Sequence, residues 1–167
     1  MRIGIYAFSG CWNLASVSIP NSLTMIERNT FENCVSLKAV TIPDGITSID
    51  NLAFSGCSSL TSVTIPNSVT SIGNLVFTNC NALTSVNSLI VEPFEIDKNV
   101  FTDDNGNFTS ATLYVPKGTK AKYEATQAWN KFLKIGRTRI FPWLTSTDPH
   151  DCISKGKTSH PYILQTL

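Results

Sequence analysis

Apolar residues recur along the first half of the chain with a spacing of 23 residues. The phrase CWNLASVSIPNSLTMI (residues 11–26) returns as CVSLKAVTIPDGITSI (34–49) and as CSSLTSVTIPNSVTSI (57–72). Four units agree at five positions: Ile3, Ile26, Ile49 and Ile72; Phe8, Phe31, Phe54 and Phe77; Cys11, Cys34, Cys57 and Cys80; Leu14, Leu37, Leu60 and Leu83; Val17, Val40, Val63 and Val86. Such agreement identifies an internal repeat.

Each unit carries about seven apolar positions, which its own 23 residues are too few to cover. They become buried only if the units stack as coils, each covering the next. Within a unit, VTI alternates as a short strand does, and the proline that follows ends the strand because it lacks an N–H. The sequence therefore predicts a mostly β, right-handed solenoid in which residues 1–94 form four repeats and like side chains lie over like, about 4.8 Å apart.

Residues 95–136 read as an irregular last repeat followed by a cap. Ile96 and Phe101 reproduce the Ile-to-Phe spacing of the earlier units, and the strand returns as LYVP (113–116). Between them, TDDNGNF adds three residues, which predict a longer loop. We then expect a helix with Thr119 as its N-cap, lying over the fifth coil. Its expected apolar face consists of Ala121, Ala125, Ala128, Trp129 and Phe132.

The two ends of the chain differ in pattern. Ile3 already stands inside a repeat, so no N-terminal cap is expected, and we interpret the chain as a fragment of a longer array or as one whose first coil something else covers. Residues 137–167 fit neither the repeat nor the cap and are expected to form a weakly ordered tail.

Composition excludes several classes of protein. The 167 residues have a net charge of +1, with 42% hydrophobic and 15% charged residues, which argues against a disordered chain and against a nucleic-acid binder. No apolar run reaches the roughly 18 residues of a membrane span, and the first residues lack the features of a signal peptide. Residues 1–94 carry three basic and five acidic side chains, whereas the remainder carries ten basic and seven acidic.

The phrase SIDNLAFSGCSSLTSVTIPNSVTSIGNLVFTNC (48–80) resembles the repeats of the BspA-like, or Treponema pallidum-type, leucine-rich repeat family. LYVPKGTKAKYEATQAWNKF (113–132) also resembles the C-terminal cap of such arrays, so the likeness covers roughly residues 3–135. It implies a leucine-rich-repeat solenoid and a bacterial surface or secreted protein that adheres to host matrix proteins, host cells or other bacteria. The family has no catalytic motif.

Other residue groups favour ordinary structural roles. The four cysteines of the repeat point the same way in a packed column, which suits buried free thiols better than disulfides or zinc. DDNGN (103–107) lacks the glycine and glutamate positions of a calcium loop and reads as a turn. We attach no meaning to the NFT sequon at 107–109. His150, Asp151, Cys152 and His160 lie in the unpatterned tail, where nothing predicts the rigid placement that catalysis requires.

The outward positions of the predicted strands form the candidate binding face. They make one row of Ser18, Thr41, Thr64 and Asn87, flanked by Ser16, Ala39, Ser62 and Ser85. The face is flat, rich in hydroxyls and nearly uncharged, and solenoids commonly bind partners on such extended surfaces. The alternative is that serine and threonine merely suit solvated strands.

Two functions remain open. We expect a non-catalytic adhesion or protein-binding module at the cell surface or secreted, with no metal and no cofactor; its partner would be a host matrix or cell-surface protein, or further repeats of the same parent chain. The alternative is a spacer or stalk within a larger surface protein, with no ligand of its own.

Overall fold

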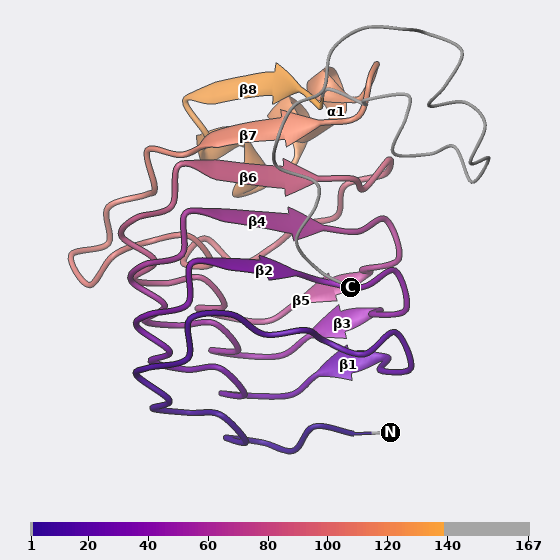
Figure 1. Ribbon diagram of the computed structural model, residues 1–167. Coiled ribbons are helices and arrows are strands. Elements are labelled where there is room, and N and C mark those ends of the chain that lie inside the picture. Colours follow the sequence, from indigo (N-terminus) through magenta and orange to yellow (C-terminus); the bar gives the residue numbers. More distant parts are fainter. Residues whose placement is uncertain (1, 139–167) are drawn as a thin grey trace, which may run out of the picture.

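A computed structural model describes residues 2–138 (Figure 1). The chain winds into a parallel β-solenoid of about five turns, as the repeat predicts. Two sheets run along the stack, and their strands are ordered β2-β4-β6-β7-β8 and β1-β3-β5. The five-stranded sheet comprises β2 (Ala39–Thr41), β4 (Ser62–Ile65), β6 (Ser85–Ser88), β7 (Thr112–Val115) and β8 (Lys134–Arg137). The three-stranded sheet comprises β1 (Met25–Ile26), β3 (Ser48–Ile49) and β5 (Ser71–Ile72).

Strand register places like residues side by side, as predicted. Val40 pairs with Val63, and Val63 with Val86, along the buried row of the five-stranded sheet. In the three-stranded sheet, Ile49 lies between Ile26 and Ile72. That second sheet is not predicted by the sequence pattern, because its strands are only two residues long and carry no alternation of their own.

The turn segments opposite the five-stranded sheet are bonded from coil to coil through the backbone. The amide of Phe31 donates to the carbonyl of Ala53 at 2.9 Å, and the amide of Phe54 to that of Val76 at 3.0 Å. Gly56 adopts φ +72° there, and a Cβ on it would stand 2.2 Å from Oδ1 of Asn33 in the preceding coil. Glycine at this position therefore leaves room for the neighbouring amide side chain.

A column of phenylalanine rings fills the core. The centroids of Phe8, Phe31, Phe54, Phe77 and Phe101 are 5.3, 5.3, 5.5 and 5.3 Å apart in sequence, with planes within 9° of parallel. Apart from Phe8, these rings are at most 2% exposed. The stacked column that the repeat predicts is thus confirmed, and each interior ring is covered on both faces.

The cap consists of α1 (Lys120–Ala125), a 3₁₀ turn at Trp129–Lys131 and strand β8. Phe132 meets the last ring of the column, Phe101, edge-on at 5.2 Å. The indole of Trp129 donates to the carbonyl of Phe94 at 2.9 Å. The hydroxyl of Tyr123 donates to the carbonyl of Ile90 at 2.8 Å.

The cap differs from its prediction in three respects. The helix ends at Ala125, so Ala128, Trp129 and Phe132 are buried beyond it, whereas Ala121 and Ala125 are exposed. The buried residue of α1 is Tyr123. Thr119 precedes the helix, but its hydroxyl donates to the carbonyl of Pro116 at 2.9 Å and caps no helical amide. The 3.6-residue pattern over residues 121–132 does not form one helix, because the backbone becomes extended at Thr126 and a separate 3₁₀ turn follows at Trp129–Lys131.

Strand β8 is not predicted by the repeat. It pairs in parallel with β7, from Thr112 opposite Lys134 to Val115 opposite Arg137, and so crosses the boundary expected after residue 136. Its sequence, KIGR, shares neither the VTI pattern nor the proline of the other coils. The tail residues from 139 onward, including His150, Asp151, Cys152 and His160, lie outside the described residues.

Candidate functional site

The candidate binding face is the outer side of the five-stranded sheet. Strand pairing places Thr41 beside Thr64 and Thr64 beside Asn87, forming one row of polar side chains. A second row runs from Ser16 through Ala39, Ser62 and Ser85. Ser18 is exposed two residues after Ser16, in a segment that joins the sheet through Ser16 alone.

Hydroxyl groups on this face differ from those elsewhere on the solenoid. Just before β3 and β5, the Oγ1 atoms of Thr47 and Thr70 each donate to a carbonyl of the preceding coil, at 3.1 and 3.2 Å. Thr61, just before β4, does the same to Lys38 at 3.1 Å. Within residues 2–138, the hydroxyls of Thr41 and Thr64 form no such bond. Their hydrogen-bonding capacity is therefore directed to solvent or to a partner.

The face continues beyond the residues that the sequence identifies. Thr112 lies beside Ser85, and Tyr114 lies beside Asn87 on the opposite edge from Thr64. β8 then adds Lys134 next to Thr112 and Gly136 next to Tyr114. The inserted loop shifts these residues out of the 23-residue count, which hides them from the repeat. Alternation within LYVP is the signal by which Tyr114 could have been found.

Three of the repeat cysteines are sealed inside the solenoid. The thiols of Cys34, Cys57 and Cys80 donate to the carbonyls of Phe8, Phe31 and Phe54, at 3.2, 3.2 and 3.4 Å. Burial raises the pKa of Cys34 to about 11 and that of Cys80 to about 12, and it also raises the pKa of Cys57. The raised pKa values favour the protonated thiols at neutral pH, which suits their packing as small apolar groups.

Cys11, in the first coil, is exposed, and all four repeat cysteines are free.

The loop at residues 103–107 is held together by one carboxylate. Oδ1 of Asp103 accepts the backbone amides of Asn105 and Asn107, at 2.9 and 2.8 Å, and Oδ2 accepts the side-chain amide of Asn107. These bonds lower the pKa of Asp103. The carboxylate thus orders its own turn. Among residues 2–138, no group of three or more His, Cys, Asp or Glu is arranged to hold a metal ion.

No helix in the described part of the chain is both long enough and apolar enough to cross a membrane.

A family model and two solved structures match this chain. The family described as "BspA type Leucine rich repeat region (6 copies)" matches residues 1–113. A crystal structure of a T. pallidum leucine-rich repeat protein has a TM-score of 0.61 and 28% identity; the match covers 80% of this chain and 61% of that one. A leucine-rich repeat protein from Bacteroides ovatus ATCC 8483 has a TM-score of 0.37 and 22% identity, covering 67% of this chain and 42% of that one.

A comparison with curated proteins gave no match. The present chain spans only 61% of the length of the T. pallidum protein. The family match, by contrast, takes in more than half of the chain and coincides with the stacked coils seen in the structure. The chain therefore belongs to the BspA-type leucine-rich repeat family.

Proposed function

We propose that the protein is a non-catalytic adhesion module that binds a protein partner through the outer side of its five-stranded sheet. One observation carries the proposal: the hydroxyls of Thr41 and Thr64 stand in register and are unbonded within residues 2–138. The BspA-type family is associated with bacterial surface proteins, which supports a place at the cell surface or outside the cell. The partner would be a host matrix protein or a protein on another cell.

The proposed face is rigid because the side chains beneath it are packed on both sides. Val63 and Val86, which alternate with the outward residues, are at most 1% exposed. A rigid surface loses little conformational freedom on binding, which favours affinity. From Ser16 and Ser18 as far as Ser85 and Asn87, the two rows carry no charged and no aromatic side chain, so contacts there are expected to be weak and to depend on several copies acting together.

A spacer role is the second candidate function. It is favoured by the hydroxyls of Thr47, Thr61 and Thr70, which tie one coil to the preceding one and so stiffen the stack rather than face a ligand. In that case the solenoid would set the distance between other parts of a surface protein. The two functions predict different responses to substitutions on the outer face.

The deciding experiment replaces Thr41 and Thr64 together with lysine and measures binding to immobilised collagen, laminin and fibronectin, and to whole host cells. Adhesion is expected to fall at least fivefold. The matched control replaces Thr47 and Thr70 with lysine, which adds the same charge with the same one-repeat spacing at the exposed positions just before β3 and β5. Circular dichroism and thermal melts check that both variants fold.

Adhesion that survives in the Thr41 and Thr64 variant, or that falls equally in the control, would count against the proposed face. The complete absence of adhesion in the unaltered chain would favour the spacer.

A further inference from the structure

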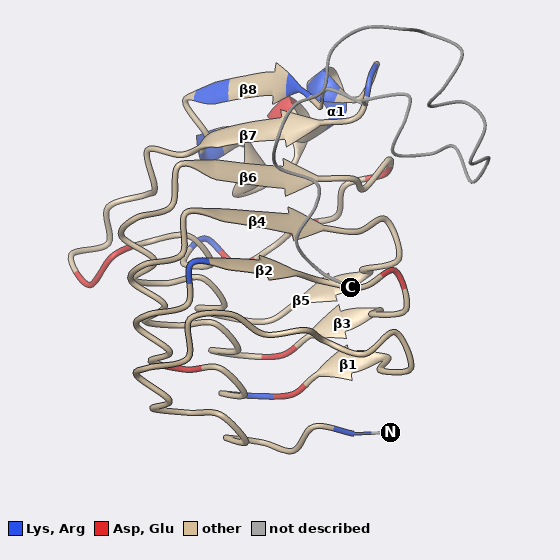
Figure 2. Cartoon of the chain, in the orientation of Figure 1, with Lys and Arg blue, Asp and Glu red and all other residues tan. Residues whose placement is uncertain are grey.

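Charge is distributed unequally along the described chain. Residues 117–137 contain six Lys or Arg and one Glu, whereas residues 2–116 contain four Lys or Arg and nine Asp or Glu. Figure 2 shows the basic residues gathered around β8 and α1 at the capped end of the stack. A net charge of +1 for the whole chain therefore conceals a basic cap on an acidic body. The cap would attract an anionic group on a partner.

β8 brings this charge onto the outer face described above. Lys134 begins the strand and lies beside Thr112, in the row that continues through Ser85 and Ser62. Within residues 2–138, Lys134 has no ion-pair partner. Two other lysines of the cap are paired, Lys120 with Glu124 and Lys122 with Glu92. Lys134 is therefore a cation of this face that is available to a ligand.

Tyr114 supplies the aromatic group of this region. Its neighbour across the strands is Gly136, and a Cβ on Gly136 would stand 3.2 Å from both Cδ1 and Cε1 of the tyrosine ring. The missing side chain leaves room for the ring beside Gly136, which lies two residues along β8 from Lys134. Tyr114 is half-buried, and its hydroxyl has no hydrogen-bond partner within the described chain.

We propose that the partner is anchored at the capped end of this face, by Tyr114 and Lys134 over Gly136, and that it presents an acidic polypeptide segment. The inference rests on the proposed binding function and specifies where and to what the face binds. Tyrosine is among the residues on which interface energy concentrates, and Lys134 adds attraction for an anionic group, whereas the hydroxyl rows offer contact without an anchor. A carboxylate on the partner pairs with Lys134 while an apolar or flat group packs on the ring.

The opposing interpretation is that Lys134 only protects an edge strand. Among the strands of residues 2–138, β8 pairs only with β7, and lysine on such an edge discourages pairing between sheets of separate molecules. On that interpretation, Lys134→Glu alters self-association and leaves ligand binding unchanged. Sedimentation of each variant separates this outcome from a binding defect.

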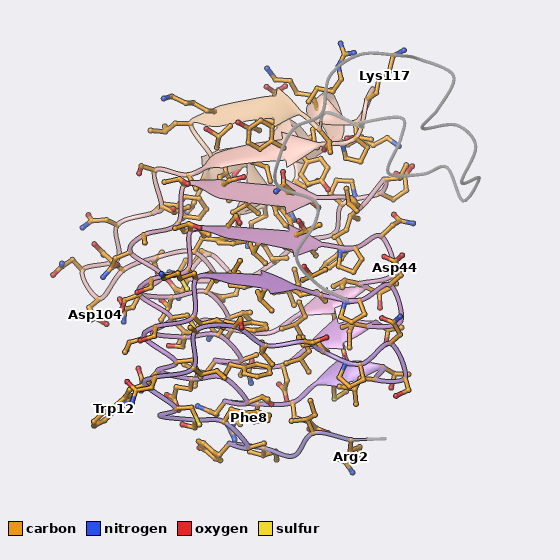
Figure 3. The ribbon with its side chains drawn as sticks, in the orientation of Figure 1. Arg2, Phe8, Trp12, Asp44, Asp104 and Lys117 are labelled. Carbon is orange, nitrogen blue, oxygen red and sulfur yellow. The ribbon has the colours of Figure 1, made fainter. Side chains whose placement is uncertain are left out.

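The test uses the full chain and a defined acidic probe, a fluorescent random copolymer of glutamate and tyrosine, with a lysine–tyrosine copolymer as its opposite. Tyr114→Ser and Lys134→Glu are each expected to weaken binding of the acidic copolymer roughly tenfold. Two matched controls should change it less than twofold. Lys117→Glu changes the net charge by the same amount on another side of the cap (Figure 3). Tyr6→Ser removes an exposed tyrosine from the opposite end of the solenoid.

Gly136→Ala provides a second line of evidence, because the added Cβ must displace the ring while leaving its chemistry intact; binding should fall threefold or more. The proposal would be overturned if Lys117→Glu and Lys134→Glu weakened copolymer binding equally, or if heparin and the acidic copolymer bound equally well. Either result would mean that the overall charge of the cap, rather than a specific site, determines binding. In another outcome, Tyr114→Ser leaves adhesion to collagen, laminin, fibronectin and cells intact while the Thr41 and Thr64 variant abolishes that adhesion. This result would contradict the anchor at Tyr114 and Lys134 but would support the proposed binding face.

Discussion

The two ends of the described solenoid differ in how far the apolar core of the outermost coil is covered. At the capped end, Phe101 closes the ring column and is 2% exposed, because Phe132 and Trp129 pack against it. At the first coil, Phe8 is half-buried and, among the described residues, stacks on Phe31 alone. Trp12 is 67% exposed there (Figure 3). A coil built to be covered on both faces thus leaves apolar surface open wherever it lacks a neighbour.

Backbone groups show the same contrast. In the first coil, the amides of Tyr6, Phe8 and Gly10 donate to carbonyls of the second coil at 3.2, 2.8 and 2.8 Å. The carbonyls of Ile5, Ala7 and Ser9 occupy the corresponding acceptor positions one repeat earlier, and within residues 2–138 no backbone amide reaches them. In this segment the backbone amides of each coil donate hydrogen bonds to the next coil toward the cap, and its carbonyls accept them from the preceding coil. A repeat cannot terminate itself, so a different sequence is needed at the closed end.

The largest expected effect compares an interior ring with the ring at the open end. Phe54→Ala removes a ring that is 0% exposed and stacked on both faces, and should lower the free energy of unfolding by about 3–5 kcal/mol. Phe8→Ala removes a ring covered on one side and should cost less than half as much. Urea titrations followed by circular dichroism measure both. Equal losses at the two positions would show that the first coil is as tightly packed as the third.

The sequence predicts the repeating coils more completely than it predicts the non-repeating cap. The repeat predicts the columns, the register of the five-stranded sheet through Asn87 and the hydroxyl rows, because identical neighbours impose identical environments. The non-repeating pattern after Thr119 predicts a capping helix and an apolar cover that includes Trp129 and Phe132, but not the details of the cap. Tyr123, β8 and the partnership of Tyr114 with Gly136 arise where the chain stops repeating, so that no neighbouring unit indicates which residues lie inside. Strands of two residues, as in β1, are too short to produce a pattern.

The next effect concerns pH. The reference pKa of the thiols is 9.0, and burial raises it to about 11 for Cys34 and about 12 for Cys80 in the folded chain. The unfolded state therefore releases protons first as pH rises, so the thiols stabilise the fold below pH 9 and this contribution is lost as pH rises toward 11 and 12. The limit is about 1.4 kcal/mol per pH unit for each thiol.

Unfolding free energies at pH 8, 9 and 10 provide the measurement, and replacing Cys34, Cys57 and Cys80 with alanine should flatten the decline. Cys11→Ala is the matched control from the open end, where the residue is exposed, and it should leave the decline in place. A decline of the same slope in the triple variant would contradict the assignment to buried thiols. Keeping the pH at or below 10 limits the contribution of Tyr123, whose pKa burial raises to about 12.

The smallest effect tests the polar bond that fastens the cap. The hydroxyl of Tyr123 lies 2.5 Å from that of Ser88 and donates to the carbonyl of Ile90, and both Tyr123 and Ser88 are 0% exposed. Tyr123→Phe leaves Ser88 and the carbonyl buried without this partner and should cost about 1–2 kcal/mol of unfolding free energy. Tyr6→Phe, at the open end, removes a hydroxyl from an exposed ring and should change little.

A double-mutant cycle sharpens this last comparison. Ser88→Ala removes the second hydroxyl, so adding it to Tyr123→Phe should cost less than the sum of the two single changes, because no stranded hydroxyl remains. Additive losses would mean that the two hydroxyls act independently and that ring packing alone holds the cap. Coupling between them would show that the capped end depends on a specific polar contact, in addition to the apolar stacking that serves every other coil.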